Sequence, residues 1–460
     1  MTTPTADIDE SAPRIRNTSE LVEHLETGSK PKADWRIGTE HEKFGFLKDG
    51  LRPLPYDGEA SVRAVLDGLA NEFGWDPIRE GEHIIGLQSH GASVSLEPGG
   101  QFELSGAPLE HIHETCNEVG RHLEEVKTIS DRLGVGFLGH GFSPIWSLEE
   151  TPLMPKGRYK IMRDYMRKVG RLGHQMMFRS CTVQTNLDFS SEADMVKKYR
   201  VSLALQPLGT ALFANSPFAE GRTNGFLSYR AHVWTDTDPD RTGMLPFVFD
   251  EGFGFEQYVD YALDVPMYFI RRDGTYLNCA GQSFRDFLEG KLPARPSELP
   301  TLEDFQDHLS TIFPEVRLKT FLEMRGSDSG PWDRICALPA FWVGILYDSQ
   351  SLDGAWDLVK HWTAEERETL RRLAPVLGLR TPLPGGKGTL QTLAKEVLAI
   401  SRSGLKARGR LSTSGDDETG FLSELESIAE SGKTPAEHLL ARYRNVWKGD
   451  LSHLFEECAF

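Results

Sequence analysis

The sequence contains few cysteines and no cysteine pattern that would bind zinc. Five cysteines are spread over 460 residues, and none belongs to a C-x-x-C pair. This spacing argues against a disulfide scaffold and a structural zinc site, and it is typical of proteins in a reducing compartment. We therefore expect a cytoplasmic protein with unpaired thiols at Cys116, Cys181, Cys279, Cys336 and Cys458.

Long apolar segments are also missing. No run approaches the ~18–20 apolar residues that span a bilayer. The N-terminal sequence MTTPTADIDE lacks the basic region and apolar core of a signal peptide. The formal net charge of −17 disfavours binding to nucleic acids and acidic membranes. We expect a soluble chain whose partners are small molecules.

Several motifs of nucleotide-binding and hydrolytic enzymes do not occur in the required context. No G-x-G-x-x-G opens a helix after a strand, and no G-x-S-x-G is present, so neither a dinucleotide-binding fold nor a serine nucleophile elbow is expected. Residues 384–388, PGGKG, lack the spacing of a phosphate-binding P-loop. We interpret that segment as a surface turn.

Acidic residues, by contrast, occupy strand positions. Residues 36–46, RIGTEHEKFGF, are typical of a β-strand in which Glu40 and Glu42 point to the same face. Adjacent carboxylates repel each other, so a protein keeps such a pair when a cation or a bound proton compensates the charge. A divalent cation such as Mg²⁺ prefers oxygen ligands of this kind. A solvated edge strand is the alternative.

A predicted hairpin carries a second acidic pair. In residues 93–105, SVSLEPGGQFELS, the PGG turn joins two alternating strands. A three-residue loop places Ser95 opposite Glu103, so Glu97 and Glu103 lie diagonally on one face, about 7–8 Å apart. Apolar residues occupy the other face, which is typical of a sheet with one packed side.

Two further segments alternate in the same way. Glu323 and Arg325 share a face in residues 321–325, and Gln184 lies on the polar face of residues 181–189. We predict that all these segments belong to one sheet whose polar face lines a charged cavity. The alternative is a set of unrelated solvated faces that happen to show the same pattern.

Glutamates around two or three Mg²⁺ ions suit chemistry on ATP without a glycine-rich phosphate loop, provided that an arginine stabilises the transferred phosphoryl group. Two alternatives remain open. A hydrolase of the glycosidase kind would use Glu97 and Glu103 as acid and base, but it would leave Glu40, Glu42 and Glu323 without a role. A protein without catalytic activity would use the acidic face only to hold a cation.

The remaining pattern predicts one large domain. We expect residues 1–17 to form a mobile tail and residues 18–460 a single catalytic domain, with an α-rich part from about residue 341 onward. Residues 111–133 are expected to form a helix with His122 on its surface. Residues 225–234 are expected to form a strand or loop edge that carries Arg230.

Longer stretches resemble a known enzyme family. RIGTEHEKFGF, SLEPGGQFELS and CTVQTNLDF are similar to glutamate–cysteine ligase of the type shared by plants and some proteobacteria, as are HVWTDTD, GMLPFVF, FEQYVDYA and FPEVRLK with LEMRG. The similarity covers nearly the whole chain from about residue 15. It implies an α+β fold like that of glutamine synthetase, with a curved antiparallel β-sheet funnel and surrounding helices.

The resemblance also implies a reaction. The γ-carboxylate of L-glutamate would be joined to L-cysteine with ATP, through a γ-glutamyl phosphate, in the first step of glutathione biosynthesis. A related carboxylate–amine ligase with another amine acceptor is the alternative. The protein is expected to be a monomer or a homodimer.

Site residues follow from the same resemblance. It implies that the Mg²⁺ ligands are Glu40, Glu42, Glu97, Glu103 and Glu323, with Gln184 as a weaker candidate where the wider superfamily often has histidine. Catalytic roles fall to Glu323 and to Arg325, which would face the transferred phosphoryl group. Arg158 and Arg230 would hold glutamate, which suits the fork of a guanidinium, and Tyr268 would belong to the cysteine pocket. A surface ion pair is the alternative for each arginine.

One departure concerns redox control. Plant members carry a cysteine fifteen residues after the position of Cys279, and this chain has Ala294 there. The plant-type disulfide switch is therefore not expected.

Overall fold

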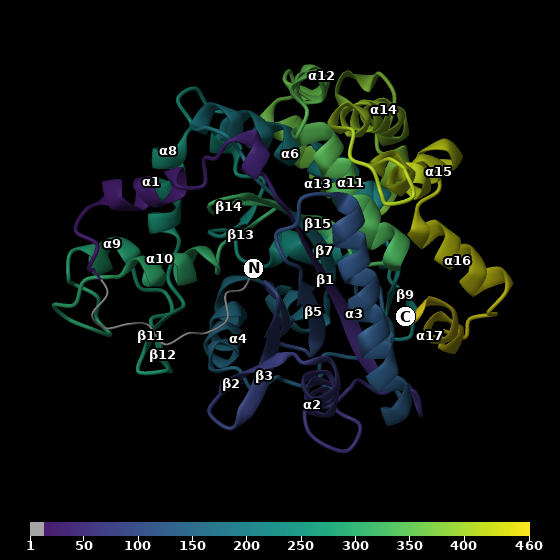
Figure 1. The fold of residues 1–460 in the computed structure, drawn as a ribbon, viewed down its shortest axis with the longest axis horizontal. Helices are drawn as coiled ribbons and strands as arrows, with labels where there is room; N and C mark the ends of the chain where they lie inside the picture. The colour runs from purple at the N-terminus through teal and green to yellow at the C-terminus, as the bar shows by residue number, and fades with distance from the viewer. Residues whose placement is uncertain (1–12) are drawn as a thin grey trace.

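The computed structural model describes residues 13–460 (Figure 1). Its centre is a nine-stranded sheet. The strands of this sheet are β1 (Ile37–Leu47), β2 (Asp76–Glu80), β3 (His83–Ser89), β4 (Ala92–Leu96), β5 (Gln101–Ser105), β6 (Val135–Leu138), β7 (Thr182–Leu187), β14 (Val316–Leu318) and β15 (Leu322–Asp328). Shorter strands form three two-stranded pairs: β8 (Phe218–Ala219) with β9 (Arg222–Thr223), β10 (Thr242–Gly243) with β13 (Phe313–Pro314), and β11 (Phe269–Arg272) with β12 (Thr275–Asn278).

Neighbouring strands of the large sheet all run antiparallel. Their order is β14-β15-β7-β1-β5-β4-β3-β2, and β6 also pairs with β1. The sheet is open, with β14 and β2 at its two ends. The strand segments predicted to share one sheet therefore do so, and the predicted α+β fold is confirmed.

Helices surround this sheet in Figure 1. The first part of the chain contributes α1 (Thr18–Glu26), α2 (Val62–Phe73), α3 (Ile112–Leu133), α4 (Gly157–Val169), α5 (Gly173–Arg179), α6 (Glu192–Leu212), α7 (Tyr229–Val233), α8 (Phe255–Asp264), α9 (Phe284–Leu288) and α10 (Leu302–Leu309). The last part contributes α11 (Trp332–Leu346), α12 (Ser349–Val359), α13 (Ala364–Leu377), α14 (Leu390–Arg408), α15 (Ser423–Ser431), α16 (Pro435–Asn445) and α17 (Ser452–Cys458). This last part is rich in helices, as its periodicity predicts.

One face of the sheet forms the core. Helices α2, α3, α6 and α11 pack against it, and α3 runs along β1 in Figure 1. Alternate strand residues such as Val94, Leu104, Val183 and Met324 are at most 1% exposed. Burying a side chain of this size stabilises a fold by about 1.5–3 kcal/mol, so the apolar face fixes which strand residues point to the opposite side.

Polar residues on the core side of β1 break this simple pattern. His41 and Lys43 are fully buried, and Lys43 Nζ lies 3.0 Å from His122 Nε2. The prediction that His122 lies on the surface is therefore wrong, because the side chain is 1% exposed beneath the sheet. Lys43 is thus a buried polar partner for His122, which lies on the apolar stripe of α3.

Two other local predictions are corrected by capping and packing. Residues 229–233 form helix α7 rather than a strand or loop edge, since Ser228 Oγ accepts the N–H of Ala231 at its N-terminus. Residues 1–12 of the predicted mobile tail lie outside the described residues. Ile15, within the same predicted tail, is 3% exposed and donates its N–H to Pro300 O at 2.8 Å.

No helix in the described part of the chain is long and apolar enough to cross a membrane.

Candidate active site

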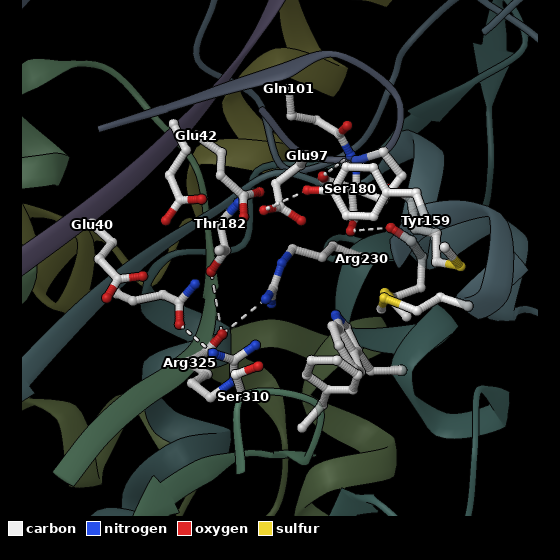
Figure 2. Close-up of a pocket in the computed structure, with 18 of the residues that line it drawn as sticks. Glu40, Glu42, Glu97, Gln101, Tyr159, Ser180, Thr182, Arg230, Ser310 and Arg325 are labelled. Carbon is white, nitrogen blue, oxygen red and sulfur yellow. Dashed lines mark hydrogen bonds between the residues drawn. The ribbon is translucent and has the colours of Figure 1, made fainter. Parts of the chain in front are cut away.

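The polar face of the sheet lines a cavity of about 90 Å³ (Figure 2). In β1, Glu42 lies directly opposite Glu103 of β5, and Glu40 lies opposite Gln184 of β7. Neighbouring strands are about 4.8 Å apart, so the register itself brings these side chains together. Glu97, at the end of the β4–β5 hairpin, joins them along the same wall (Figure 2).

The hairpin adopts the predicted register. Ser95 pairs with Glu103, and the N–H of Glu97 bonds to Gln101 O at 2.9 Å across the turn. Gly100 has φ of +85°, which favours glycine, and a Cβ on Gly99 would lie 2.1 Å from Phe178 O. The glycines therefore allow the hairpin to approach α5 closely, which places Glu97 in the cavity.

Burial and like charge disfavour the ionised forms of two carboxyl groups in this wall, those of Glu42 and Glu103. Glu103 is 3% exposed, and the hydroxyls of Ser95 and Ser105 each donate to it at 3.0 Å. Burial, followed by the charges of Glu40 and Glu97, raises the pKa of Glu103 to about 8. Burial and the charges of Glu103 and Glu97 also raise the pKa of Glu42 well above its usual value. Such a group favours either bound protons or a bound cation.

The donor set fits magnesium that is held together with a phosphate ligand. Among residues 13–460, no group of three or more His, Cys, Asp or Glu side chains is arranged to hold a metal ion by itself. Mg²⁺ usually takes one or two carboxylates and completes its shell with water and substrate phosphates. Glu40, Glu42, Glu97 and Glu103 supply oxygen donors for that arrangement.

Glu323 is not part of this wall. It is fully buried and does not line the cavity, and both of its oxygens accept hydrogen bonds from Arg317. Gln184 does line the cavity, but its side-chain oxygen accepts from Arg325 Nη1 at 2.7 Å. The two remaining metal candidates therefore contact arginines.

Three predicted arginines face the cavity from other elements. Arg325 comes from β15, Arg230 from α7 and Arg158 from α4. Figure 2 shows Arg230 between the glutamate wall and Arg325, and its Nη2 donates to Arg325 O at 2.8 Å. The Nε atoms of Arg158 and Arg230 are buried without a protein hydrogen-bond partner. Buried guanidinium donors in this state point to an anionic ligand such as a carboxylate.

Tyr268 lies elsewhere. It is 1% exposed, does not line the cavity, and packs against the guanidinium of Arg241 at 3.9 Å from the ring centre. Among the other predicted site residues, Arg158 lies near Tyr268, since its guanidinium packs on the ring of the adjacent Phe269.

Apolar side chains also line the cavity. They form an apolar wall of Met162 of α4, Met176 and Met177 of α5, Trp234 and Phe313, and Figure 2 shows sulfur atoms near Tyr159. The sequence pattern does not identify this wall, because its members lie on separate short elements and ordinary helix stripes. Only the position of α4 and α5 beside the hairpin identifies them.

Comparisons with known proteins agree with this geometry. Residues 36–457 match the model of "Glutamate-cysteine ligase family 2 (GCS2)". The chain is 58% identical to glutamate–cysteine ligase B, chloroplastic, of Oryza sativa subsp. japonica, over 96% of this chain and 87% of that protein. It is 57% identical to the chloroplastic glutamate–cysteine ligase of Arabidopsis thaliana, over 96% of this chain and 82% of that protein.

The chain belongs to the glutamate–cysteine ligase family. The resemblance identified from the sequence is thereby confirmed. A solved glutamate–cysteine ligase from Francisella tularensis, in complex with AMP, is similar in fold, with a TM-score of 0.55 and 12% identity over 92% of this chain and 89% of that one.

The names of these relatives correct one prediction. They are chloroplastic enzymes, which contradicts the cytoplasmic location expected for this family member. The expectation rested on unpaired, widely spaced cysteines, and this pattern is typical of any reducing compartment.

The cysteine positions bear on redox control in this ligase family. Cys279 is fully buried, and burial raises the pKa of its thiol to about 11. Because residue 294 is alanine, Cys279 lacks the partner cysteine of the plant-type disulfide. Cys116 and Cys336, which are distant in sequence, meet in the core between α3 and α11, where burial and their contact raise the pKa of Cys116. Independence from the plant-type switch stays a prediction.

Proposed function

We propose that the protein joins the γ-carboxylate of L-glutamate to the amine of L-cysteine in an ATP-dependent reaction. Family membership supports this assignment. The observation that carries it is a single cavity with carboxylates along one wall and unpaired arginine donors facing them. A ligase that acts on an amino acid and a nucleotide needs both kinds of group.

The carboxylate wall is the proposed metal site. Glu40, Glu42, Glu97 and Glu103 would hold two or three Mg²⁺ ions with the phosphates of ATP. Bound there, magnesium would neutralise phosphate charge and polarise the transferred phosphoryl group. The pKa values of Glu42 and Glu103, raised by burial and then by neighbouring carboxylates, support this role, because a bound cation favours the ionised form of both groups.

The arginines are the proposed anchors of substrate anions. Arg158 and Arg230 would bind the α-carboxylate of glutamate through their unpaired Nε donors, leaving the γ-carboxylate directed at ATP. A γ-carboxylate oxygen then attacks the terminal phosphorus, the bond to ADP breaks, and Arg325 binds the oxygens of the transferred group. The amine of the second substrate attacks the resulting acyl carbon, and phosphate leaves.

The methionine wall is the proposed place for the acceptor side chain. Met162, Met176 and Met177 offer a thiol an apolar, polarizable surface. A hydroxyl buried there without a hydrogen bond would cost about 1–3 kcal/mol, so serine is disfavoured relative to cysteine. This assignment differs from the predicted role of Tyr268, which is not among the residues that line the cavity.

A product assay tests the proposal. The protein is incubated with ATP, Mg²⁺, L-glutamate and a panel of amino acids, and the products are identified by mass spectrometry. We expect γ-glutamylcysteine and stoichiometric phosphate, with no product when magnesium is chelated. Equal use of other amines would instead indicate a general carboxylate–amine ligase, and cleavage of a glycoside would indicate the hydrolase alternative.

A further inference from the structure

The structure contains a second cavity that shares no lining residue with the carboxylate cavity. It has a volume of about 560 Å³ and is lined by residues of α6, the 3-10 helix η3 (Pro246–Phe249), α12 and the start of α13. Its rim is open to solvent, since Lys360 and Ala364 are exposed. A ligand in this cavity would therefore bind outside the proposed active site.

Arg367 of α13 is the buried cation of this cavity. The residue is 5% exposed, and its guanidinium packs on the ring of Phe249, with Cζ 3.4 Å from the ring centre. Its Nη1 donates to the carbonyl of Trp362. Within residues 13–460, Nε and Nη2 have no hydrogen-bond partner, and no carboxylate forms an ion pair with this guanidinium. A buried guanidinium with donors left over points to an anionic ligand.

A second guanidinium adds to the positive charge. Arg200 of α6 donates Nε to Val248 O and Nη2 to Asp250 O, both at 2.8 Å. These acceptors are neutral carbonyls, so the hydrogen bonds hold the side chain without neutralising its charge. Together with Lys360, the lining has three cations and one acid, Asp250, on a chain whose formal net charge is −17. This local excess of positive charge attracts an anion.

Aromatic rings form most of the remaining lining. Phe247 belongs to η3, Trp356 to α12, and Trp362 to the connection between α12 and α13. All three are half-buried, so part of each ring stays accessible. Accessible aromatic faces stack on flat rings. The lining therefore suits a ligand that combines an aromatic ring with negative charge.

We propose that this cavity binds a small organic anion that carries an aromatic ring. Arg367 and Arg200 contact the anionic group, and Trp356 and Trp362 contact the ring. Nucleoside phosphates and aromatic carboxylates share this chemistry. The site is additional to the proposed ligase site and does not depend on the proposed ligase function.

Calorimetric titration tests the site with two anionic probes, AMP and 4-hydroxybenzoate. At least one should bind the wild type, and Arg367→Gln should weaken that binding by about tenfold or more, because charge-assisted hydrogen bonds are lost. Arg372→Gln makes the same change at an exposed position of α13 and should keep the wild-type affinity. Binding of AMP in the carboxylate cavity would be the same in all three proteins, so only the part lost in Arg367→Gln belongs to this site. No binding of either probe, or equal affinities in all three proteins, would overturn the proposal.

Smaller probes separate the contribution of the charge from that of the ring. Inorganic phosphate and acetate carry charge without a ring, whereas adenosine and phenol carry a ring without a full charge. Each should bind several-fold more weakly than AMP or 4-hydroxybenzoate. Tighter binding of AMP would assign the site to phosphates, and tighter binding of 4-hydroxybenzoate would assign it to carboxylates; both results support the proposal. Phosphate that binds through Arg367 as tightly as AMP would overturn it.

A second pair of variants keeps the test valid if Arg367→Gln does not fold. Lys360→Glu reverses a charge at the rim, where Lys360 is exposed and pairs with Asp357 at 2.7 Å. Lys395→Glu is the matched control, since Lys395 is exposed on α14 and pairs with Glu430 at 2.7 Å. Only Lys360→Glu should weaken probe binding several-fold at low salt, with a smaller effect at high salt. Equal affinities in these two variants would overturn the proposal without bearing on the ligase function, because the two cavities share no lining residue.

Discussion

Two buried glutamates on one sheet, Glu103 and Glu323, have opposite electrostatic surroundings. Both are at most 3% exposed. Serine hydroxyls and other carboxylates surround Glu103, and its pKa is raised to about 8 by burial and then by the neighbouring acids. Glu323 is bound by Arg317 and lies close to Arg325, and its pKa is lowered. Burial alone therefore does not determine the role of a carboxylate. Its partners decide whether it needs a cation or already has one.

The two surroundings arise from strand pairing. Glu42, an acid, lies opposite Glu103, whereas Arg317, a base, lies opposite Glu323. An acid pair is stable when a ligand completes it, and an acid–base pair is complete within the protein. The β1–β5 pairing therefore brings two acids together, whereas the β14–β15 pairing places an acid beside a base.

The largest effect is expected from a substitution in the carboxylate wall. Glu103→Gln should lower turnover at sub-saturating Mg²⁺ by more than about tenfold, because even outer-shell changes at metal sites have effects of that size. Without Mg²⁺, the thermal midpoint should stay the same or rise, since glutamine carries no carboxyl group that must be protonated or left charged when buried. Initial rates across a Mg²⁺ series and thermal unfolding measure the two effects. Glu430→Gln, on the exposed surface of α15, is the control and should leave both unchanged.

A comparable effect, confined to glutamate binding, is expected from Arg230, which faces the glutamate wall. Arg230→Lys keeps the charge but loses the fork, and an unmade charge-assisted hydrogen bond is worth about 1.5–3 kcal/mol. KM for glutamate should rise by about tenfold or more, while KM for ATP stays near the wild-type value. A defect specific to ATP would place Arg230 on the phosphate side instead.

The apolar wall can be changed without altering the glutamates or the arginines of the cavity. Met177→Gln introduces an amide into the wall beside the acceptor. The preference for cysteine over serine, as a ratio of kcat/KM, should fall by about 1–3 kcal/mol, the range for a changed apolar contact. Met177→Leu retains an apolar side chain and serves as the matched control. An unchanged ratio in Met177→Gln would remove this wall from the acceptor site.

The smallest effect is expected from His308, which lies next to the segment whose carbonyls bind Arg317. His308 lies in the last turn of α10, just before the carbonyls that bind Arg317, and its Nε2 lies 2.8 Å from Ala262 O. Burial is the main cause that lowers its pKa to about 4 from 6.5. As pH falls from about 6.5 to about 4, the unfolded state takes up a proton that the folded state refuses, so stability decreases.

Thermal unfolding at about pH 7.5 and pH 5 should show this loss in the wild type and a smaller loss in His308→Gln. His438→Gln changes an exposed histidine on α16 and should retain the wild-type dependence. Equal pH dependence in all three proteins would contradict the role of His308.

Much of the site could be predicted from local alternation. The two-residue period of a β-strand places Glu40 and Glu42 on the same face. The PGG turn places Glu103 opposite Ser95, because the length of a hairpin loop determines the register of its strands. Tyr268 and His122 could not be placed this way. Their surroundings come from elements far away in sequence, such as Arg241 for Tyr268 and Lys43 for His122.

The sequence by itself determined the family, the strand faces and the acidic character of the cavity, since these depend on residue order and on side-chain period. Only the tertiary structure decided which acids remain without a cation. Lys319 and Arg317 precede Glu323 by four and six residues, but a β14–β15 pairing is needed to bring Arg317 opposite its carboxylate. Electrostatic energy depends on distance and burial, and neither quantity is fixed until the chain has folded.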